Sequence, residues 1–273
     1  MKKNFPTLRQ DEDQVGDAMK FMRPLIIAIG LFFVWQAVVL LTEVPFFILP
    51  SPMLVAVAMI EHADRLFEDG LVTLVEILGG LFFGIILGTA SALIIGLFRP
   101  ARQWLMPVMV VSQAIPVFAL APILVLWIGY GIGSKIAMAT LIIYFPVTAA
   151  LFDGLRRTNT GYLDLARTMN ASRWSVLRYI RIPAAMPSFA SGVRVATAVA
   201  PIGAIVGEWV GASHGLGALM LHSSGRTQID VMFAALLVLA VMAILLYFSV
   251  DWLLRRMLTW SPDSLPSNEK VGL

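Results

Sequence analysis

The stretch GYLDLARTMNASRWSVLRYIRIPAAMP, Gly161–Pro187, is a polar, arginine-bearing segment inside an otherwise hydrophobic chain. Its pattern predicts a short helix over Tyr162–Met169, a break, and a second helix over Arg173–Ile180. Asp164 is expected in the first turn of the first helix, where a carboxylate interacts favourably with the helix dipole. Because so many charged side chains are costly in hydrocarbon, the segment is expected to lie outside the membrane.

Residues that commonly end or begin helices occur at the break and at the end of this segment. Asn170 can adopt the left-handed conformation that ends a helix. Ser172 can cap the second helix. Pro183 and Pro187 are expected to stop that helix and begin a membrane span.

Apolar residues within the segment recur at helical spacing. Tyr162 precedes Leu165 by three positions and Met169 follows it by four, so the three side chains can form one apolar knob for docking. A solvated basic loop is the alternative interpretation, but it leaves this apolar spacing unexplained.

The composition of the chain as a whole is that of an integral membrane protein. Of its 273 residues, 59% are hydrophobic and only 14% are charged, whereas a soluble domain carries about 25% charged residues. The length accommodates about six helical spans of about 20 residues each. The absence of cysteine excludes disulfides, thiolate metal ligands and cysteine nucleophiles. The net charge of +3 does not indicate nucleic-acid binding, because the basic residues flank the apolar runs.

The predicted fold is all-α, with six transmembrane helices between two polar tails. A cytoplasmic N-terminal tail is expected over residues 1–23, a transmembrane domain over 24–254, and a cytoplasmic C-terminal tail over 255–273. The N-terminal tail lacks the apolar core of a secretory signal, so the first apolar run is expected to remain as an anchor. The expected spans are about 24–41, 71–98, 104–128, 135–152, 188–210 and 231–254.

Two segments between these spans are expected to form shorter helices. Residues 53–70 look amphipathic and predict a helix on the membrane surface. The glycine-rich loop 211–230 predicts a short re-entrant or surface helix. Within the third span, prolines interrupt the helix, which a membrane protein tolerates where protein or a watery cavity satisfies the freed carbonyls.

Small residues repeat at every fourth position in two of the spans. Such stripes let another helix backbone approach closely. Ordinary helix packing and a specific dimer or gate contact both explain them. The stripes are Gly80, Gly84, Gly88, Ala92 and Gly96 in one span, and Ser188, Gly192, Ala196, Ala200 and Ala204 in the other.

Lysine and arginine are distributed very unevenly between the two sides of a six-span arrangement. Sixteen lie on the side of the termini and of the opening segment, against three, Arg65, Lys135 and Arg226, on the other. Because positive charge is retained on the cytoplasmic side, both termini and the opening segment are predicted to be cytoplasmic.

The sequence contains none of the common motifs for nucleotide binding, metal binding or nucleophilic catalysis. There is no GxxxxGK[ST] phosphate loop, no HExxH metal motif and no GxSxG nucleophile elbow. We therefore expect no catalytic residue, no metal site and no cofactor, so that any ATP driving transport is bound by another subunit.

Three ionisable residues fall within the predicted spans, where such groups are candidates for function. Glu76, near the outer end of its span, is expected to face solvent or an interface. Arg194 can snorkel to the cytoplasmic surface or form an inter-span ion pair or gate. Glu208 is an interfacial carboxylate beside Trp209 or a group aimed into a pathway. The middles of the spans otherwise contain almost no ionisable residues, which disfavours an ion-coupled carrier.

The opening segment resembles the cytoplasmic signature of the permease subunits of bacterial ABC importers. That signature reads Glu-Ala-Ala, three residues, Gly, nine residues and Ile-x-Leu-Pro. Here Asp164-Leu165-Ala166 is followed after three residues by Asn170, and after nine more by Ile180-Arg181-Ile182-Pro183. The spacing matches throughout, and the main departure is Asn170 in place of glycine.

The resemblance implies a type I ABC importer permease fold in the inner membrane, with a cytoplasmic coupling loop over about 156–187. It implies three kinds of protein partner: an ABC ATPase subunit, a periplasmic substrate-binding protein and a second permease copy in a homodimer. The residues expected to couple to the ATPase are Asp164, Leu165, Ala166, Met169, Asn170, Ile180 and Pro183. The candidate pathway residues are Gln113, Pro116, Tyr144, Arg194 and Glu208.

Two further stretches narrow the resemblance to a subgroup. LPSP at Leu49–Pro52 and EWVGASHGLGALM at Glu208–Met220 look like permeases for nitrate, sulfonates, taurine or pyrimidine thiamine precursors. Leu221–Leu236 looks most like the pyrimidine-precursor permeases, which implies a hydroxymethylpyrimidine-type solute. An ion-coupled secondary carrier and a non-transporting membrane scaffold are the alternatives from other classes.

Overall fold

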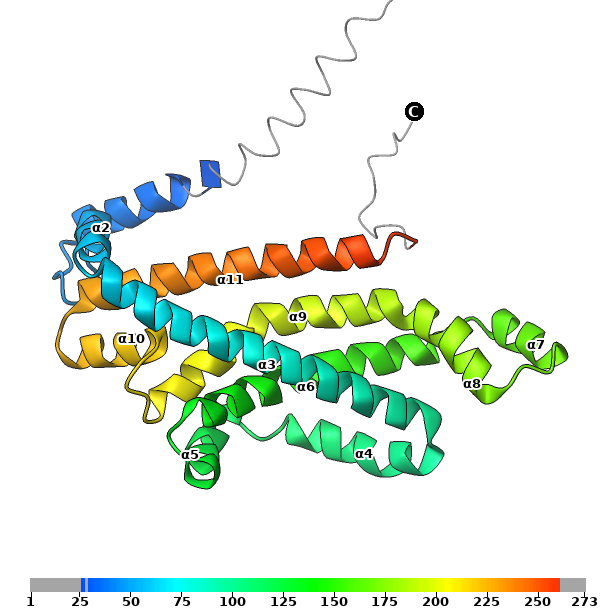
Figure 1. Ribbon diagram of the computed structural model, residues 1–273. Helices are drawn as coiled ribbons and strands as arrows, with labels where there is room; N and C mark the ends of the chain where they lie inside the picture. The colour runs from blue at the N-terminus through cyan, green and yellow to red at the C-terminus, as the bar shows by residue number, and fades with distance from the viewer. Residues whose placement is uncertain (1–25, 28, 261–273) are drawn as a thin grey trace, which may run out of the picture. The chain divides into compact units, whose positions relative to one another are not determined.

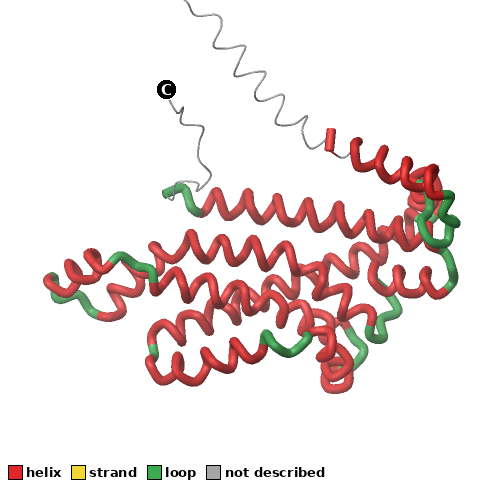
Figure 2. The backbone as a smooth tube through the Cα atoms, turned by 180° about the vertical axis from the view of Figure 1, so that it is seen from behind, coloured by secondary structure: helices red, strands yellow, loops and turns green. Residues whose placement is uncertain are grey.

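The computed structural model describes residues 26, 27 and 29–260 (Figure 1). The expected N-terminal tail and most of the expected C-terminal tail lie outside the described residues. Throughout the described part all regular structure is helical, which confirms the all-α class (Figure 2). The helices after Ile29–Thr42 are α2 Pro52–Glu61, α3 Ala63–Leu97, α4 Arg99–Ser112, α5 Val117–Ile128, α6 Ile132–Arg156, α7 Thr160–Thr168, α8 Arg173–Val176, the π-helical turn η1 Leu177–Arg181, α9 Ile182–Trp209, α10 Leu216–Gly225 and α11 Ile229–Met257.

Four helical stretches in the described residues are long and apolar enough to cross a membrane. They are Ala63–Leu97, Ile132–Arg156, Arg173–Trp209 and Ile229–Met257. Shorter apolar helices occur at Ile29–Thr42, Pro52–Glu61 and Val117–Ile128. The multi-pass architecture is therefore confirmed, and the count of six spans stays a prediction.

The third expected span is two helices rather than one. α4 ends at Ser112 and α5 begins at Val117, so the chain leaves helical geometry between them. Pro116 precedes α5 in an extended conformation, with φ −60° and ψ 113°. Proline lacks the N–H that would continue the helix and clashes with the preceding turn, which accounts for the break.

The expected surface helix over 53–70 is wrong at its C-terminal end. α2 ends at Glu61, and α3 begins at Ala63 and continues without interruption to Leu97. The charged residues after Ala63 therefore belong to the first turns of a membrane-spanning helix. Asp69 is one of them, and it is buried.

The described chain forms two compact units. One contains the residues up to Ala63 together with Ser223–Ala234, and in it the rings of Trp35 and Phe233 lie 5.9 Å apart. The other contains Asp64–His222 and the chain from Ala235 onward. We call this second unit the main unit; it contains α4 to α9 and most of α3 and α11.

Glycine stripes let α6 pack closely against both α3 and α9 in the main unit. A Cβ added at Gly84 of α3 would lie 2.5 Å from Ile143 Cγ2, and one at Gly88 would lie 3.0 Å from Val147 Cβ. Toward α9, a Cβ at Gly192 would lie 2.5 Å from the Ala150 Cβ of α6. Such close approach is possible only without side chains, so packing within the chain explains the stripes.

Pro183 and Pro187 do not stop the second helix of the opening segment, contrary to expectation. α8 passes through η1 directly into α9, with Pro183 in the first turn of α9 and Pro187 inside it. A π-helical turn shifts the hydrogen-bond register, which lets the helix absorb a position where proline contributes no donor. Arg173–Trp209 is consequently one continuous helical stretch of 37 residues.

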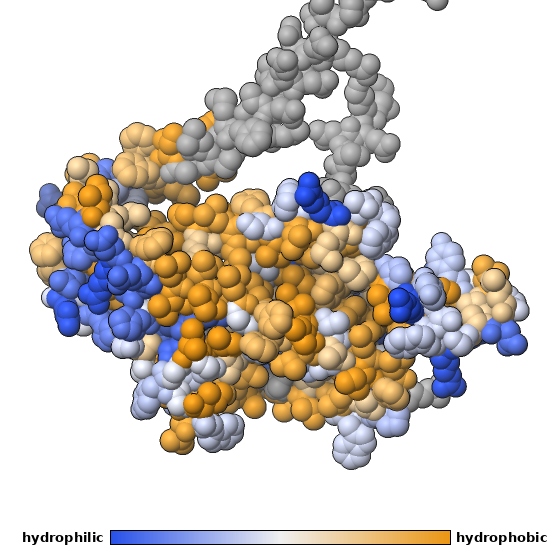
Figure 3. All heavy atoms as spheres, in the orientation of Figure 1, coloured by the Kyte–Doolittle hydropathy of each residue, from blue (hydrophilic) through white to orange (hydrophobic). Residues whose placement is uncertain are grey.

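The two ends of the main unit differ in character. The α3–α4 turn, α7, α8 and the end of α11 lie at one end, and the start of α10 lies at the other (Figure 1). Between them, apolar side chains cover the surface of the helices (Figure 3). Polar side chains gather near the start of α3 and α10 at one end and, mixed with apolar ones, near α7 and α8 at the other (Figure 3). This arrangement matches helices that span an apolar layer with water at both ends.

Candidate functional site

The segment predicted to couple to the ATPase begins with the capped helix α7. The side chain of Asn159 accepts a hydrogen bond of 2.8 Å from the N–H of Gly161, which satisfies one of the free donors at the helix start. Because α7 starts at Thr160, Asp164 does not lie in the first turn, and that expectation is wrong. Asp164 instead forms an ion pair of 2.9 Å with Arg167 on the exposed surface.

Asn170 closes α7 in the left-handed conformation, as predicted, with φ +55°. Its N–H donates to the carbonyl of Arg167 over 3.0 Å, and the N–H of Ala171 donates to the carbonyl of Ala166 over 2.9 Å. These two bonds form a Schellman motif, in which glycine is the usual left-handed residue. Asparagine therefore keeps the turn that the family signature forms with glycine.

Ser172 caps α8, also as predicted. Its hydroxyl accepts a hydrogen bond of 3.1 Å from the N–H of Ser175. Only two residues, Asn170 and Ala171, separate Met169, the C-cap of α7, from this cap. The turn between the two helices is therefore short and closed by hydrogen bonds at both sides.

An apolar knob and a groove beside it form the exposed surface of this segment. Tyr162, Leu165 and Met169 are 62%, 59% and 73% exposed, although all three are apolar or aromatic. The groove has a volume of about 520 Å³. Its lining includes Tyr162, Leu165, Ala166, Met169, Tyr179 and Ile180.

The groove belongs to the apolar knob and is distinct from a larger cavity of about 780 Å³ beside the same helices. Ala166 is buried under the knob, while Leu165 and Met169 stand at the rim of the groove. Of the predicted coupling residues, Asp164, Asn170 and Pro183 do not line the groove. An exposed apolar patch of this kind, rimmed by polar residues, is typical of a protein–protein contact.

The candidate pathway residues lie in separate environments rather than in one site. Gln113 and Pro116 are exposed in the break between α4 and α5. Tyr144 is half-buried and packs on an apolar cluster. Arg194 forms an inter-span ion pair, with its Nε 2.6 Å from Oδ1 of Asp251 on α11, so it does not snorkel to the surface.

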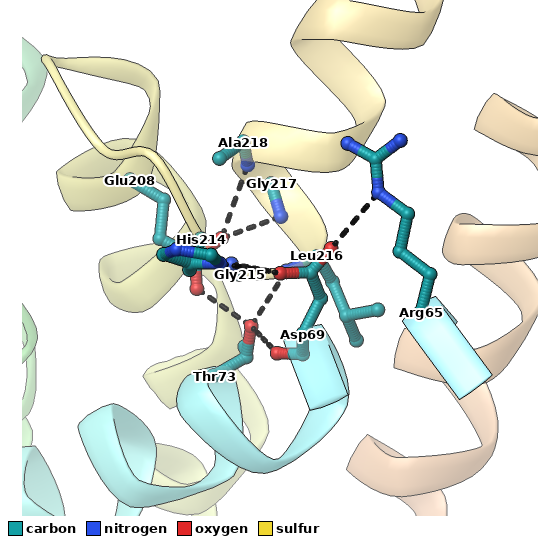
Figure 4. A network of polar contacts seen from close by, with 9 residues as sticks. All are labelled: Arg65, Asp69, Thr73, Glu208, His214, Gly215, Leu216, Gly217 and Ala218. Atoms are coloured by element: carbon teal, nitrogen blue, oxygen red, sulfur yellow. Dashed lines mark hydrogen bonds and ion pairs between the residues drawn. The ribbon is translucent and has the colours of Figure 1, made fainter. Parts of the chain in front are cut away.

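Glu208 belongs to a buried polar network at the opposite end of the main unit (Figure 4). It is 1% exposed, so it is not the interfacial carboxylate expected as one alternative. Its Oε2 accepts hydrogen bonds from the N–H groups of Gly217 and Ala218, and its Oε1 accepts one of 2.6 Å from the hydroxyl of Thr73.

This network satisfies the N-terminus of α10 entirely with side chains from other helices. Asp69 Oδ1 accepts a hydrogen bond of 2.8 Å from the N–H of Gly215. Thr73 Oγ1 accepts a hydrogen bond of 2.8 Å from the N–H of Leu216. With the two bonds to Glu208, all four donors that a helix start leaves free have acceptors. We call Asp69, Thr73 and Glu208 the α10 clamp.

Basic side chains lie near the α10 clamp. Arg65 Nε lies 3.7 Å from Asp69 Oδ2, and His214 Nδ1 lies 3.8 Å from Asp69 Oδ1 (Figure 4). Lys135 is buried, and its Nζ donates to the carbonyls of Tyr130 and Gly131 over 2.8 and 3.1 Å.

Glu76 is also buried at this end of α3, with 1% of its surface exposed. The expectation that it faces solvent or an interface is therefore wrong. Its Oε2 has no hydrogen-bond partner among the described residues.

Sequence reasoning missed the α10 clamp because it divided α3 between a surface helix and a span. Asp69, Thr73 and Glu76 are spaced by four and then three residues, which places polar groups on one face of a continuous helix. That spacing, opposite a glycine-rich loop that begins a helix, is the signal that could have revealed the contact.

Comparison with known proteins agrees with this architecture. The model of the family described as "Binding-protein-dependent transport system inner membrane component" matches residues 80–259. A probable ABC transporter permease protein of Haemophilus influenzae is 53% identical over 243 residues, covering 89% of this chain and 99% of that protein.

Two relatives with named solutes are also similar. The formylaminopyrimidine transport permease protein ThiX of Halalkalibacterium halodurans is 35% identical, covering 88% of this chain and 96% of that protein. The riboflavin transport system permease protein RibX of Chloroflexus aurantiacus is 37% identical, and the match covers 83% of this chain and 85% of that protein.

A solved structure of the MetNI methionine ABC transporter in an inward-facing conformation shares the fold. Its TM-score is 0.63 at 19% sequence identity, covering 72% of this chain and 97% of that chain. These findings leave the secondary-carrier and scaffold hypotheses without support. The chain belongs to the family of binding-protein-dependent transport system inner membrane components and is a permease subunit of an ABC importer.

Proposed function

We propose that this permease carries a hydroxymethylpyrimidine-type thiamine precursor across the inner membrane. The supporting observation is the similarity to a formylaminopyrimidine permease along nearly the whole of both chains. The similarity to a riboflavin permease makes a second heteroaromatic solute, riboflavin, the competing candidate. Aliphatic sulfonates, taurine and nitrate are further alternatives.

We also propose that the transport cycle requires three partners. A separate ABC ATPase subunit binds and hydrolyses ATP, a periplasmic binding protein delivers the solute, and a second copy of the permease completes the pathway. The permease itself holds no nucleotide, because its sequence has no phosphate-binding loop.

The apolar knob on α7 is the proposed docking surface for the ATPase. Tyr162, Leu165 and Met169 are exposed although their burial in a partner would be favourable by about 25 cal/mol per Å² of apolar area. The Schellman turn ties α7 to α8, and α8 continues through η1 into α9. A displacement of α7 would therefore act on a helix that enters the membrane without a flexible joint.

The docking proposal is tested by replacing one exposed apolar residue in the knob and one outside it. Leu165→Ser should weaken co-purification of the ATPase and reduce uptake at least tenfold, because the knob loses its central side chain. Trp174→Ser is the matched control, since Trp174 is equally exposed, at 62%, but does not line the groove. If both variants lose ATPase co-purification and uptake to the same extent, the proposal that α7 is the docking element is wrong.

The solute is tested with the complete transporter reconstituted in proteoliposomes. Uptake of radiolabelled hydroxymethylpyrimidine should require ATP and the binding protein, and should resist an ionophore that collapses ion gradients. Competition by excess riboflavin, taurine, an alkanesulfonate or nitrate identifies the alternatives. ATP-dependent uptake of labelled riboflavin without ATP-dependent uptake of labelled hydroxymethylpyrimidine would reject the pyrimidine assignment.

A further inference from the structure

A second cavity lies beside α7 and α8, separate from the groove of the apolar knob. It has a volume of about 780 Å³ and is formed by the end of α3, the start of α4, and the segment from α7 to η1. Among the described residues, three arginines, Arg167, Arg173 and Arg181, line it, and no acidic side chain does. The nearby carboxylate of Asp164 is paired with Arg167. The cavity therefore attracts an anionic group.

One of the three arginines has a buried donor without a partner. Arg181 is half-buried, and its Nε is inaccessible to solvent and makes no hydrogen bond within the described residues. An unpaired buried donor of a charged group is unfavourable, so its presence indicates an acceptor that binds there. An anion with several oxygens, such as a phosphate, suits guanidinium groups that converge from several directions.

The apolar part of the lining identifies the source of the phosphate. Leu97 and Phe98 are 42% and 58% exposed and stand at the end of membrane span α3, while Leu177 forms a buried wall. The cavity thus lies where a span ends, at the depth of the lipid headgroups, with apolar side chains next to its arginines. Basic pockets between helices at this level suit the headgroups of anionic phospholipids.

We propose that this cavity binds the phosphate headgroup of an anionic phospholipid from the surrounding bilayer. The arginines contact the phosphate, and Leu97 and Phe98 contact the first part of the acyl chains. The lipid would join the α3–α4 turn to the segment that carries α7. This proposal is independent of the transported solute.

The test measures lipid retention by the purified full-length permease with native mass spectrometry and a titration of fluorescent phosphatidylglycerol. The wild type should retain phosphatidylglycerol or cardiolipin in preference to phosphatidylcholine. Arg173→Gln should weaken binding about fivefold, the effect of one cationic side chain near an anionic lipid. Arg181→Gln should weaken it about tenfold or more, since a charge-assisted hydrogen bond is also lost.

Arg178→Gln is the matched control. Arg178 lies on the same segment, over the ring of Tyr179, but does not line the cavity, so its variant should bind within about twofold of the wild type. Arg181→Lys provides a second variant if the glutamine variant unfolds; it keeps the charge and should retain intermediate affinity.

Three results would overturn the proposal. Equal retention of anionic lipid and phosphatidylcholine would show that the cavity does not recognise the lipid by its charge. Displacement of the lipid by inorganic phosphate at equal concentration would assign the cavity to a soluble anion. Unchanged lipid binding with lost ATPase association in the Arg173 and Arg181 variants would assign the arginines to a protein partner.

Discussion

Asn170 shows how a single backbone conformation can preserve a family signature. Left-handed backbone costs a residue with a Cβ about 1–2 kcal/mol, less for asparagine because its side chain tolerates this region. Both hydrogen bonds of the Schellman turn form around Asn170. The identity of the residue therefore matters less than its ability to adopt φ +55°.

Substitution of Asn170 tests this directly. Asn170→Gly should leave uptake and ATPase co-purification unchanged, because glycine adopts the same conformation without strain. Asn170→Val should lower both, since a β-branched side chain opposes positive φ. Uptake assays in membranes with matched expression of the permease provide the measurement. A valine variant as active as the glycine variant would contradict the role of the turn.

At the other end of the main unit, Thr73 connects three elements through one hydroxyl. It accepts from Leu216 at the start of α10 and donates to Glu208 at the end of α9. Removing it leaves a buried N–H without an acceptor and a buried carboxyl oxygen without a donor. Such unsatisfied groups cost about 1–3 kcal/mol each.

Thr73→Val should therefore destabilise the start of α10. Thermal unfolding of the purified protein should occur at a lower temperature, and limited proteolysis should cut the 211–215 loop faster. Thr197→Val is the matched control, because Thr197 is equally buried but its hydroxyl bonds only the Val193 carbonyl in its own helix. If both variants behave alike, the clamp does not hold α10.

At the scale of elements, the packing of α3 on α6 depends on glycine at fixed positions. Gly80, Gly84 and Gly88 face Ala139, Ile143 and Val147, so both helices advance by four residues between contacts. The facing residues are small or β-branched at the points of contact. β-Branched side chains have restricted χ1 angles, and they cannot easily move aside.

Gly84→Ala should consequently destabilise the helix pair by about 1–3 kcal/mol through overpacking. The new Cβ would meet Ile143 Cβ at 2.8 Å, which requires a backbone shift. Gly30→Ala is the control, because no atom lies within 4 Å of a Cβ at that position. Thermal unfolding in detergent distinguishes them, and an equally stable Gly84→Ala variant would show that the helices can separate without loss.

At the scale of the whole molecule, orientation in the membrane follows from charge. The α3–α4 turn, α7, α8 and the end of α11 share one end of the main unit, and all of them contribute to the arginine-rich side of the sequence (Figure 1). The α10 clamp lies at the other end. We predict that the first end is cytoplasmic.

The absence of native cysteine makes this prediction simple to test. In intact spheroplasts, a membrane-impermeant maleimide should label Ser213→Cys but not Thr168→Cys, since both positions are exposed and lie at opposite ends. Inverted vesicles should give the reverse pattern. Labelling of Thr168→Cys in intact spheroplasts would reverse the assigned topology.

Local sequence features were sufficient for the membrane class, the position of most helices, and the turn at Asn170. Hydrophobic run length, proline and glycine positions and residue spacing act within a few residues of one another, so they are readable along the chain. The same locality explains the confirmed caps at Asn170 and Ser172.

Only the tertiary structure decided the environments of Glu76, Glu208 and Arg194, and the continuity of the helix through Pro183 and Pro187. Burial and ion pairing depend on residues far away in sequence, as in the contact of Thr73 with Leu216 and Glu208. A proline's effect likewise depends on whether the surrounding helix can shift its hydrogen-bond register, as it does at η1. Long-range packing therefore determined which polar residues in the spans are buried and bonded, and which remain available at the two ends of the molecule.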